Sequence, residues 1–161
     1  MRAVRVLLAT DASWLVDDLV AALGDEDTSF TVCSEGREVS PQIARAADAG
    51  DLYDVGIFDL QIGSMGGMAV TMALRLDASV GRAPSMPVVM LLDRVADVHL
   101  ARRSDAEGWL VKPLDPLRIR GAVRTVLAGG TFREGLPPEP FVDEAPAEEA
   151  DSAGSEVVTA G

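Results

Sequence analysis

The chain has 161 residues, of which 48% are apolar, and it carries a formal net charge of −12 at pH 7. This is enough apolar material for the core of one domain, and no apolar run approaches the roughly eighteen residues of a membrane-spanning helix. The acidic balance argues against nucleic acid as a partner, and the single cysteine, Cys33, excludes an internal disulfide and a cysteine-cluster metal site. The N-terminal apolar run is too short for a signal peptide, so we expect a cytoplasmic protein that does not enter a membrane.

Hydrophobic periodicity predicts five strands that alternate with five helices. The strands are expected at residues 4–9, 30–33, 55–58, 88–92 and 109–111, each a short and nearly continuous apolar run. The helices are expected between Ser13 and Gly24, between Ser40 and Gly50, over residues 68–76 and 96–103, and between Asp115 and Gly129.

Capping residues and apolar spacing define these helices. Ser13 and Ser40 are the predicted N-caps, and Pro41 is expected at the first helical position. The residues expected on apolar helix faces are Leu15, Leu19 and Leu23 with Val16 and Val20 beside them, then Ile43, Ala44 and Ala47, then Met68, Met72 and Leu76, and finally Ile119, Val123, Val126 and Leu127.

Five strand–helix units with strands this apolar indicate an α/β fold, a doubly wound five-stranded parallel sheet with helices on both faces. The apolar pattern stops at Thr131, and from Glu134 onward there are eight acidic residues and no Lys or Arg. We therefore expect one domain over residues 1–130 and an acidic, Pro- and Ala-rich disordered tail over residues 131–161. Such a tail either keeps the protein soluble, or it binds a partner or inhibits its own domain.

Three charged residues follow the ends of three predicted strands. Asp11 follows the first strand, Asp59 the third and Lys112 the fifth, and ligands of such sheets bind beyond the carboxyl ends of the strands. Two neighbouring carboxylates resist joint ionisation unless a cation such as Mg²⁺ joins them. Lys112 would then face a phosphoryl group carried by one of the carboxylates. Taken singly, each residue is also explained as a helix-terminal acid, a turn cap or a surface lysine.

Two longer motifs contain these residues. Residues 59–67 read DLQIGSMGG, and residues 108–114 read GWLVKPL. Over about residues 3–130 the chain resembles the receiver domain of two-component response regulators, in which an acid at a strand end precedes a Met and a Gly, and an aromatic residue precedes a Lys-Pro pair. The resemblance implies a flavodoxin-like (βα)5 fold with the strand order 2-1-3-4-5.

The resemblance also implies roles for individual residues. Asp59 would accept a phosphoryl group from a sensor histidine kinase in a phosphorelay, Lys112 would contact the phosphate, and the Lys-Pro bond would be cis. Mg²⁺ would be held by Asp11, Asp59 and the backbone carbonyl of Gln61. Beyond self-phosphorylation and slow dephosphorylation, no enzymatic activity is expected.

The sequence departs from the family pattern at the site. Thr10 stands where the family has a second acid, which predicts weaker Mg²⁺ binding. Leu92 and then Asp93 stand where the family has a hydroxyl residue followed by a small one. Trp109 fills the position of the aromatic switch residue, so Leu92 and Trp109 form a switch pair without its hydroxyl. Residues 62–63 are Ile-Gly where Met-Pro is usual, and Gln61 and Arg94 match positions that tune hydrolysis of the phosphoryl group.

Three functional readings follow. The first is a single-domain response regulator without a DNA-binding domain. It would signal to an unknown protein through its fourth helix, fifth strand and fifth helix, or relay its phosphate to another protein. The sequence leaves open whether it forms a homodimer. The second is a pseudo-receiver, a binding module that signals without phosphate, which Thr10, Leu92 and Asp93 favour. The third is an enzyme on a similar sheet.

Two observations speak against the enzyme. Aspartyl-phosphate phosphatases show a second acid two residues after the nucleophile, where this chain has Gln61. Flavin proteins need a phosphate-binding glycine loop after the first strand, and residues 10–13 read TDAS. His99, the single histidine, is expected on the surface.

Overall fold

The computed structural model describes residues 2–135 of the chain. Its strands are β1 (Val4–Ala9), β2 (Thr28–Cys33), β3 (Val55–Asp59), β4 (Val88–Leu92), β5 (Gly108–Val111) and β6 (Phe132–Arg133). They form one parallel sheet in the order β2-β1-β3-β4-β5-β6. The predicted doubly wound α/β sheet is therefore confirmed, with its first five strands in the expected order.

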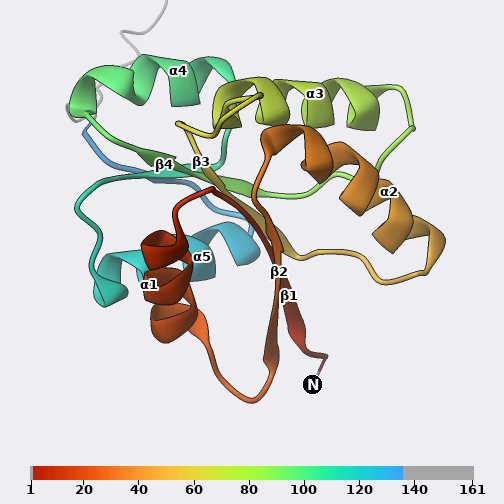
Figure 1. Cartoon of the computed structure of the whole chain (residues 1–161), viewed down its shortest axis with the longest axis horizontal. Coiled ribbons are helices and arrows are strands. Elements are labelled where there is room, and N and C mark those ends of the chain that lie inside the picture. The colour runs from red at the N-terminus through yellow and green to blue at the C-terminus, as the bar shows by residue number, and fades with distance from the viewer. Residues whose placement is uncertain (1, 136–161) are drawn as a thin grey trace, which may run out of the picture.

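Five helices cover the two faces of this sheet. They are α1 (Ser13–Leu23), α2 (Val39–Asp48), α3 (Gly67–Ser79), α4 (Val98–Arg103) and α5 (Pro116–Leu127), and short 3-10 turns, η1 (Gly36–Glu38) and η2 (Val95–Asp97), precede α2 and α4. Helices α1 and α5 lie on one face, and α2, α3 and α4 lie on the other (Figure 1). Within residues 2–135, no helix is both long enough and apolar enough to cross a lipid bilayer.

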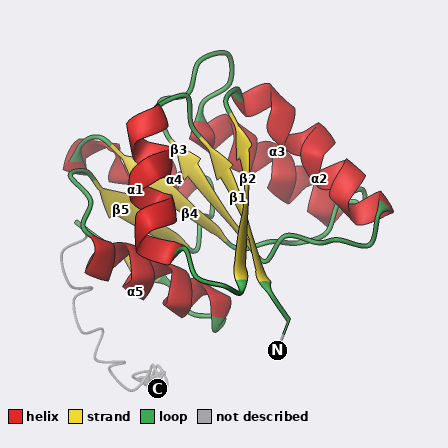
Figure 2. Cartoon of the chain, turned by 60° about the horizontal axis from the view of Figure 1, so that its bottom comes forward, coloured by secondary structure: helices red, strands yellow, loops and turns green. Residues whose placement is uncertain are grey.

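Helices flank the sheet on both sides (Figure 2). The core accordingly has two layers of buried side chains, one on each side of the sheet. Leu15 and Ile119 anchor the layer under α1 and α5, whereas Ile43, Val70 and Val98 anchor the layer under α2, α3 and α4. Every residue of β3 and β4 is buried, which is why these strands read as unbroken apolar runs. Full burial of a Leu or Ile side chain stabilises the fold by about 1.5–3 kcal/mol, so the two layers hold the central strands firmly in place.

Two of the predicted helix caps are wrong. Ala12 is the N-cap of α1, so Ser13 is already helical, and α2 begins at Val39, one residue before Ser40. The turn η1 leads directly into α2 and sets its start. Pro41 is then the third helical residue, which is tolerated because the first N–H groups of a helix have no partner within it.

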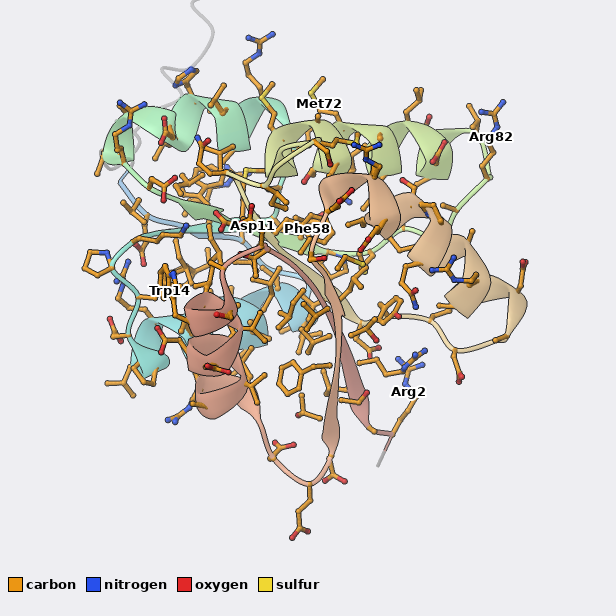
Figure 3. All side chains as sticks on the ribbon, viewed as in Figure 1. Arg2, Asp11, Trp14, Phe58, Met72 and Arg82 are labelled. Atoms are coloured by element: carbon orange, nitrogen blue, oxygen red, sulfur yellow. The ribbon has the colours of Figure 1, made fainter. Side chains whose placement is uncertain are left out.

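Several residues expected on buried helix faces are exposed. Met72 and Leu76 are 46% and 64% exposed, and Val20, Ala44 and Leu127 are exposed as well. A row with a spacing of four residues drifts around a helix that repeats every 3.6 residues. In α3 the opposite side packs on the sheet instead, and it consists of Gly67, Val70, Thr71 and Leu74. Figure 3 shows Met72 on the outer side of α3.

Strand β6 was not predicted. Phe132 and Arg133 extend the sheet beyond β5, although we expected the tail to begin at Thr131. A strand of two residues has no alternation that periodicity could detect, and it forms because β5 and α5 offer it contacts. The rest of the predicted disordered tail, residues 136–161, lies outside the described residues.

Candidate functional site

The carboxyl ends of β1, β3 and β5 bring the predicted site residues to one edge of the sheet. Asp59 is the last residue of β3, and Figure 3 shows Asp11 where β1 leads into α1. The loop after β3 turns back sharply, because a Cβ atom at Gly67 would lie 2.5 Å from the carbonyl oxygen of Asp59. Only glycine fits there, and this tight turn keeps the mouth of the loop next to the Asp59 carboxylate.

Asp59 and Lys112 form a direct ion pair. Lys112 Nζ lies 2.9 Å from Asp59 Oδ1, and the two side chains are 14% and 3% exposed. The backbone N–H of Gln61 donates to the same Oδ1 at 3.3 Å. The Lys112-Pro113 peptide bond is cis, and the Lys112 amide donates to the carbonyl of Leu92 at 2.8 Å. An ammonium group held this close to a buried carboxylate fixes the orientation of that carboxylate.

Lys112 also binds a second carboxylate. Its Nζ lies 3.0 Å from Oδ1 of Asp93, whose side chain is 38% exposed. Desolvation by burial lowers the pKa of Lys112, but the hydrogen bonds to Asp59 and Asp93 outweigh it, so the pKa is raised above its ordinary value. The ammonium therefore stays charged at neutral pH and is shared between an inner and an outer carboxylate.

Thr10 forms part of the same network. Its hydroxyl donates to Asp59 Oδ2 at 3.0 Å and accepts from the backbone N–H of Ala12 at 3.1 Å, and the residue is buried. Both oxygens of Asp59 are thus hydrogen-bonded, one by Thr10 and one by Lys112. From the sequence we regarded Thr10 only as a missing acid. A hydroxyl residue directly after a strand, beside another strand that ends in Asp, was the signal for this contact.

The oxygen donors at this edge fit a hard divalent cation. Asp11 is exposed, and its Oδ2 accepts from the N–H of Gly63 at 3.4 Å. The predicted ligands, which are the carboxylates of Asp11 and Asp59 and the carbonyl of Gln61, would give Mg²⁺ a partial oxygen set that water completes. Asp11, Asp59 and Asp93 carry three negative charges against one positive charge on Lys112, so a divalent ion would balance the site. Within residues 2–135, no three His, Cys, Asp or Glu side chains gather as a metal cluster.

The two predicted switch residues, Leu92 and Trp109, have different surroundings from Asp59 and Lys112. Leu92 is completely buried at the end of β4 and has no polar atom in its side chain. Trp109 is also completely buried, and its Nε1–H donates to the carbonyl of Glu134 at 2.7 Å. The guanidinium of Arg133 lies 5.4 Å from the centre of a Trp109 ring. The predicted switch aromatic is thus held by residues of the C-terminal segment, which the sequence did not single out.

A cavity of about 690 Å³ lies at the other end of the strands, between the last turn of α1 and the last turn of α5. Val4, Gly24, Thr28, Arg120 and Leu127 are among the residues that line it. None of the residues predicted for the site lies there, so this cavity is separate from the Asp59 network.

Comparison with known proteins identifies the fold. No family model and no curated protein matches the sequence. A chemotaxis response regulator of Vibrio cholerae, CheY4, is 24% identical, with a TM-score of 0.61 over 77% of this chain and 98% of that one. A response regulator described as putative, from Chloroflexus aurantiacus, is 19% identical, with a TM-score of 0.68 over 79% and 99% of the two chains. The chain has the fold of a response-regulator receiver domain.

A third structure is the receiver domain of a signal transduction histidine kinase from Syntrophus aciditrophicus. It is 20% identical to this chain, with a TM-score of 0.65 over 79% of this chain and 92% of that one. The alignments to these structures cover almost the whole length of each receiver domain. The receiver fold therefore accounts for the strand order and for the position of the Asp59 network at the carboxyl edge of the sheet.

Within this receiver fold, the predicted site residues fall into two groups. Asp59 and Lys112 touch, and the Gln61 amide joins them. Leu92 and Trp109 are buried in the core on the β4 and β5 side, with no polar contact to Asp59 among the described residues. Sequence reasoning missed the polar contacts made by Thr10, Asp93 and Glu134.

Proposed function

We propose that this chain is a response regulator of a two-component system, which accepts a phosphoryl group on Asp59 from a sensor histidine kinase and signals by contact with another protein. The observation that carries this proposal is the buried Asp59 carboxylate at the end of a central strand, 2.9 Å from the ammonium of Lys112. Nucleic acid has no part in it, since the chain is strongly acidic.

The proposed reaction needs only one reactive side chain. An oxygen of Asp59 attacks the phosphorus of a phosphohistidine, a P–O bond forms as the P–N bond breaks, and the imidazole leaves with the electron pair and takes up a proton. The product is an acyl phosphate. Lys112 stays beside the carboxylate and neutralises charge on the phosphoryl oxygens, as positioned cations do in phosphoryl transfer. Self-phosphorylation and slow hydrolysis are the only reactions that we assign to the chain.

Mg²⁺ fits this proposal as a cofactor. Asp11, Asp59 and the carbonyl of Gln61 would hold it, and the ion would neutralise charge on the phosphoryl group. Thr10 replaces the second acid of the family pattern, and its hydroxyl donates a hydrogen bond to Asp59. We therefore expect weaker Mg²⁺ binding than a site with two adjacent acids would give. A cytoplasmic location and an open choice between monomer and homodimer belong to the same proposal.

The second candidate is a pseudo-receiver. One contact favours it: the exposed Asp93 carboxylate holds Lys112 at 3.0 Å and would compete with a phosphoryl group for its ammonium. Leu92 offers no hydroxyl to read a phosphoryl group. In this case the chain would bind its partner through the receiver fold itself, and phosphorylation would be irrelevant to that binding.

One experiment separates the two candidates. The protein is incubated with acetyl phosphate and Mg²⁺, and its intact mass is measured. The response-regulator proposal expects the mass of one phosphoryl group on the wild type and none on Asp59→Asn, which keeps the size of the side chain. Asp93→Asn serves as a matched control, because it also removes one carboxylate from Lys112 but leaves the acceptor in place. A wild type that gains no mass, or an Asp59→Asn variant that gains as much, would reject phosphorylation at Asp59.

A further inference from the structure

The C-terminal segment beyond α5 returns to the sheet and occupies the edge of β5. Phe132 pairs with Gly108 and Arg133 pairs with Trp109, and the Phe132 amide donates to the carbonyl of Glu107 at 3.0 Å. Two residues of strand pairing are too little to hold a segment in place by themselves. The attachment must therefore depend on side chains, and these define a specific groove between β5 and α5.

The first anchor of the segment is the carboxylate of Glu134. Arg118 Nε lies 2.7 Å from Oε1, its Nη2 contacts Oε2, and the N–H of Val111 donates to Oε2 at 3.2 Å. The same guanidinium donates to the carbonyls of Val111 and Pro113 at 2.8 and 2.7 Å. Arg118 is therefore held at the end of β5 by backbone contacts, and a two-pronged guanidinium in this position is a receptor for a carboxylate.

The second anchor is the aromatic ring of Phe132, which packs against the core layer under α1 and α5. Gly108 of β5 lets the segment lie close to the sheet, because a Cβ atom there would lie only 3.1 Å from the Phe132 carbonyl oxygen. Gly121 of α5 lies beside the Phe132 ring, where a Cβ atom would make an ordinary contact of 3.7 Å. The groove thus offers an edge of β5 for strand pairing, an apolar surface for a ring and, two residues further on, a guanidinium for a carboxylate.

We propose that this groove is a docking site for an extended segment of a partner protein with an aromatic residue and, two residues later, a carboxylate, and that residues 132–134 occupy it as an intramolecular competitor. The partner would add a strand to β5 as the chain's own segment does, with backbone hydrogen bonds for affinity and the ring and carboxylate for specificity. The site is distinct from the Asp59 network, and it does not depend on phosphorylation at Asp59.

The turn between α5 and β6 would allow the segment to detach from β5 while α5 stays folded. Gly129 has a φ of +87°, and Gly130 follows it, so the helix ends in a turn that separates α5 from the strand. Release of residues 131–135 would break the contacts of Glu134 and Phe132 but no hydrogen bond inside α5. A segment on such a short linker competes at an effective concentration of about 1 mM, so a partner binds the whole chain more weakly than it binds the empty groove.

The test uses a labelled peptide with the sequence of residues 129–135 (GGTFREG) and the full chain. Binding is measured by fluorescence anisotropy to the wild type and to a Phe132→Ala/Glu134→Gln variant, in which the internal segment has lost both anchors. The peptide should bind the variant at least about tenfold more tightly than the wild type, because the competitor is weakened. A control peptide with Gln in place of Glu should lose about tenfold in affinity, as should the variant with Arg118→Gln added.

The variants must be folded for these results to count. Circular dichroism should show a cooperative melt for each, and Glu134→Gln alone replaces the double variant if Phe132→Ala unfolds the chain. The proposal is overturned if folded variants do not bind the peptide, or bind the Gln peptide equally well. A wild-type dimer that Glu134→Gln abolishes would also overturn it, since the groove would then be filled by a second copy of the chain.

Discussion

The two halves of the carboxyl edge of the sheet differ in the polar contacts that their side chains make. On the side of β1 and β3, the buried Asp59 carboxylate is hydrogen-bonded at one oxygen by Thr10 and at the other by Lys112, which reaches it from the end of β5. On the side of β4 and β5, the buried Leu92 offers no hydrogen bond, and Trp109 bonds instead to the C-terminal segment. The residues that we propose to accept a phosphoryl group and the residues predicted to detect it thus lie in different parts of the edge, so one set can change while the other is kept.

The two halves meet at one atom, the Nζ of Lys112. It donates to Asp59 on the first side and to Asp93 on the second. Any change of charge at Asp59 is therefore felt first by Lys112 and then by Asp93. The ammonium thus connects the side chain of Asp59 to the side chain of Asp93, the residue that follows β4.

Lys112→Met should produce the largest effect, because it removes this link. It leaves the buried Asp59 carboxylate without its cation, and we expect a loss of about 2–3 kcal/mol in the free energy of unfolding, at the low end for a broken buried pair because Lys112 is partly exposed. Phosphorylation by acetyl phosphate should slow at least about a hundredfold. Urea denaturation and intact-mass kinetics measure the two effects.

Lys112→Arg is the matched control for that variant. It keeps the charge, but a planar guanidinium cannot bridge Asp59 and Asp93 from a single atom as the ammonium does. We expect it to recover most of the stability and only part of the rate. Equal rates for the Met and Arg variants would show that the charge of Lys112 does not assist phosphorylation.

Changes at Thr10 should have the next largest effect, confined to the acceptor half. Thr10→Val removes the hydroxyl that donates to Asp59 Oδ2, and we expect a loss of about 1–2 kcal/mol in the free energy of unfolding. Thr10→Asp should lower the stability without metal, because it adds a like charge, and should restore it with Mg²⁺. Thermal melts across a Mg²⁺ titration check this, and a Thr10→Asp variant that does not respond to Mg²⁺ would contradict a metal site at Asp11 and Asp59.

Asp93→Asn should have a smaller effect, on the rate alone. It leaves Lys112 paired with Asp59 only and removes a negative charge beside the incoming phosphoryl group, so we expect phosphorylation to become about threefold faster. The free energy of unfolding should change by less than about 0.5 kcal/mol, since Asp93 is the exposed partner of the pair. A slower reaction would mean that Asp93 positions Lys112 and does not compete for it.

The smallest effect concerns pH. The pKa of Lys112 is raised in the folded state, so its ion pairs contribute fully below the ordinary lysine pKa of about 10.4 and are lost as pH rises through the higher folded pKa. The stability difference between the wild type and Lys112→Met should therefore be constant between about pH 6 and 9 and shrink only in more alkaline solution. Urea titrations at several pH values measure it, and a difference that falls below pH 9 would mean that Lys112 is not the residue that titrates.

Much of the fold could be predicted from the sequence, because parallel strands that are buried on both faces consist of consecutive apolar residues. The convergence of Asp59 and Lys112 followed as well, since the carboxyl ends of such strands share one edge. The composition held a further signal that we did not use. Lys112 is the single lysine beside thirteen arginines, which suggests a position where a compact ammonium is needed and a guanidinium is not suitable.

What the sequence did not reveal depends on side-chain direction and on single contacts. The face of α3 was assigned wrongly because two apolar rows were present, and packing on the sheet selected the row with the small residues Gly67 and Thr71. The bridging of Lys112 to Asp93 depends on the direction of a flexible side chain, which residue spacing cannot give. Strand β6 depends on the ion pair between Arg118 and Glu134. These residues are 16 positions apart, and no periodic pattern in the sequence connects them.

Strand β6 has a consequence for the behaviour of the protein in concentrated solution. Strand β5 reads GWLV, and without Phe132 and Arg133 its outer N–H and C=O groups would be unpaired. An uncharged apolar strand at the rim of a sheet is a template on which other chains assemble into aggregates. By covering β5 with a short strand that ends in Arg133, the chain places a positive charge at its rim, and repulsion between the Arg133 side chains of two copies then opposes stacking.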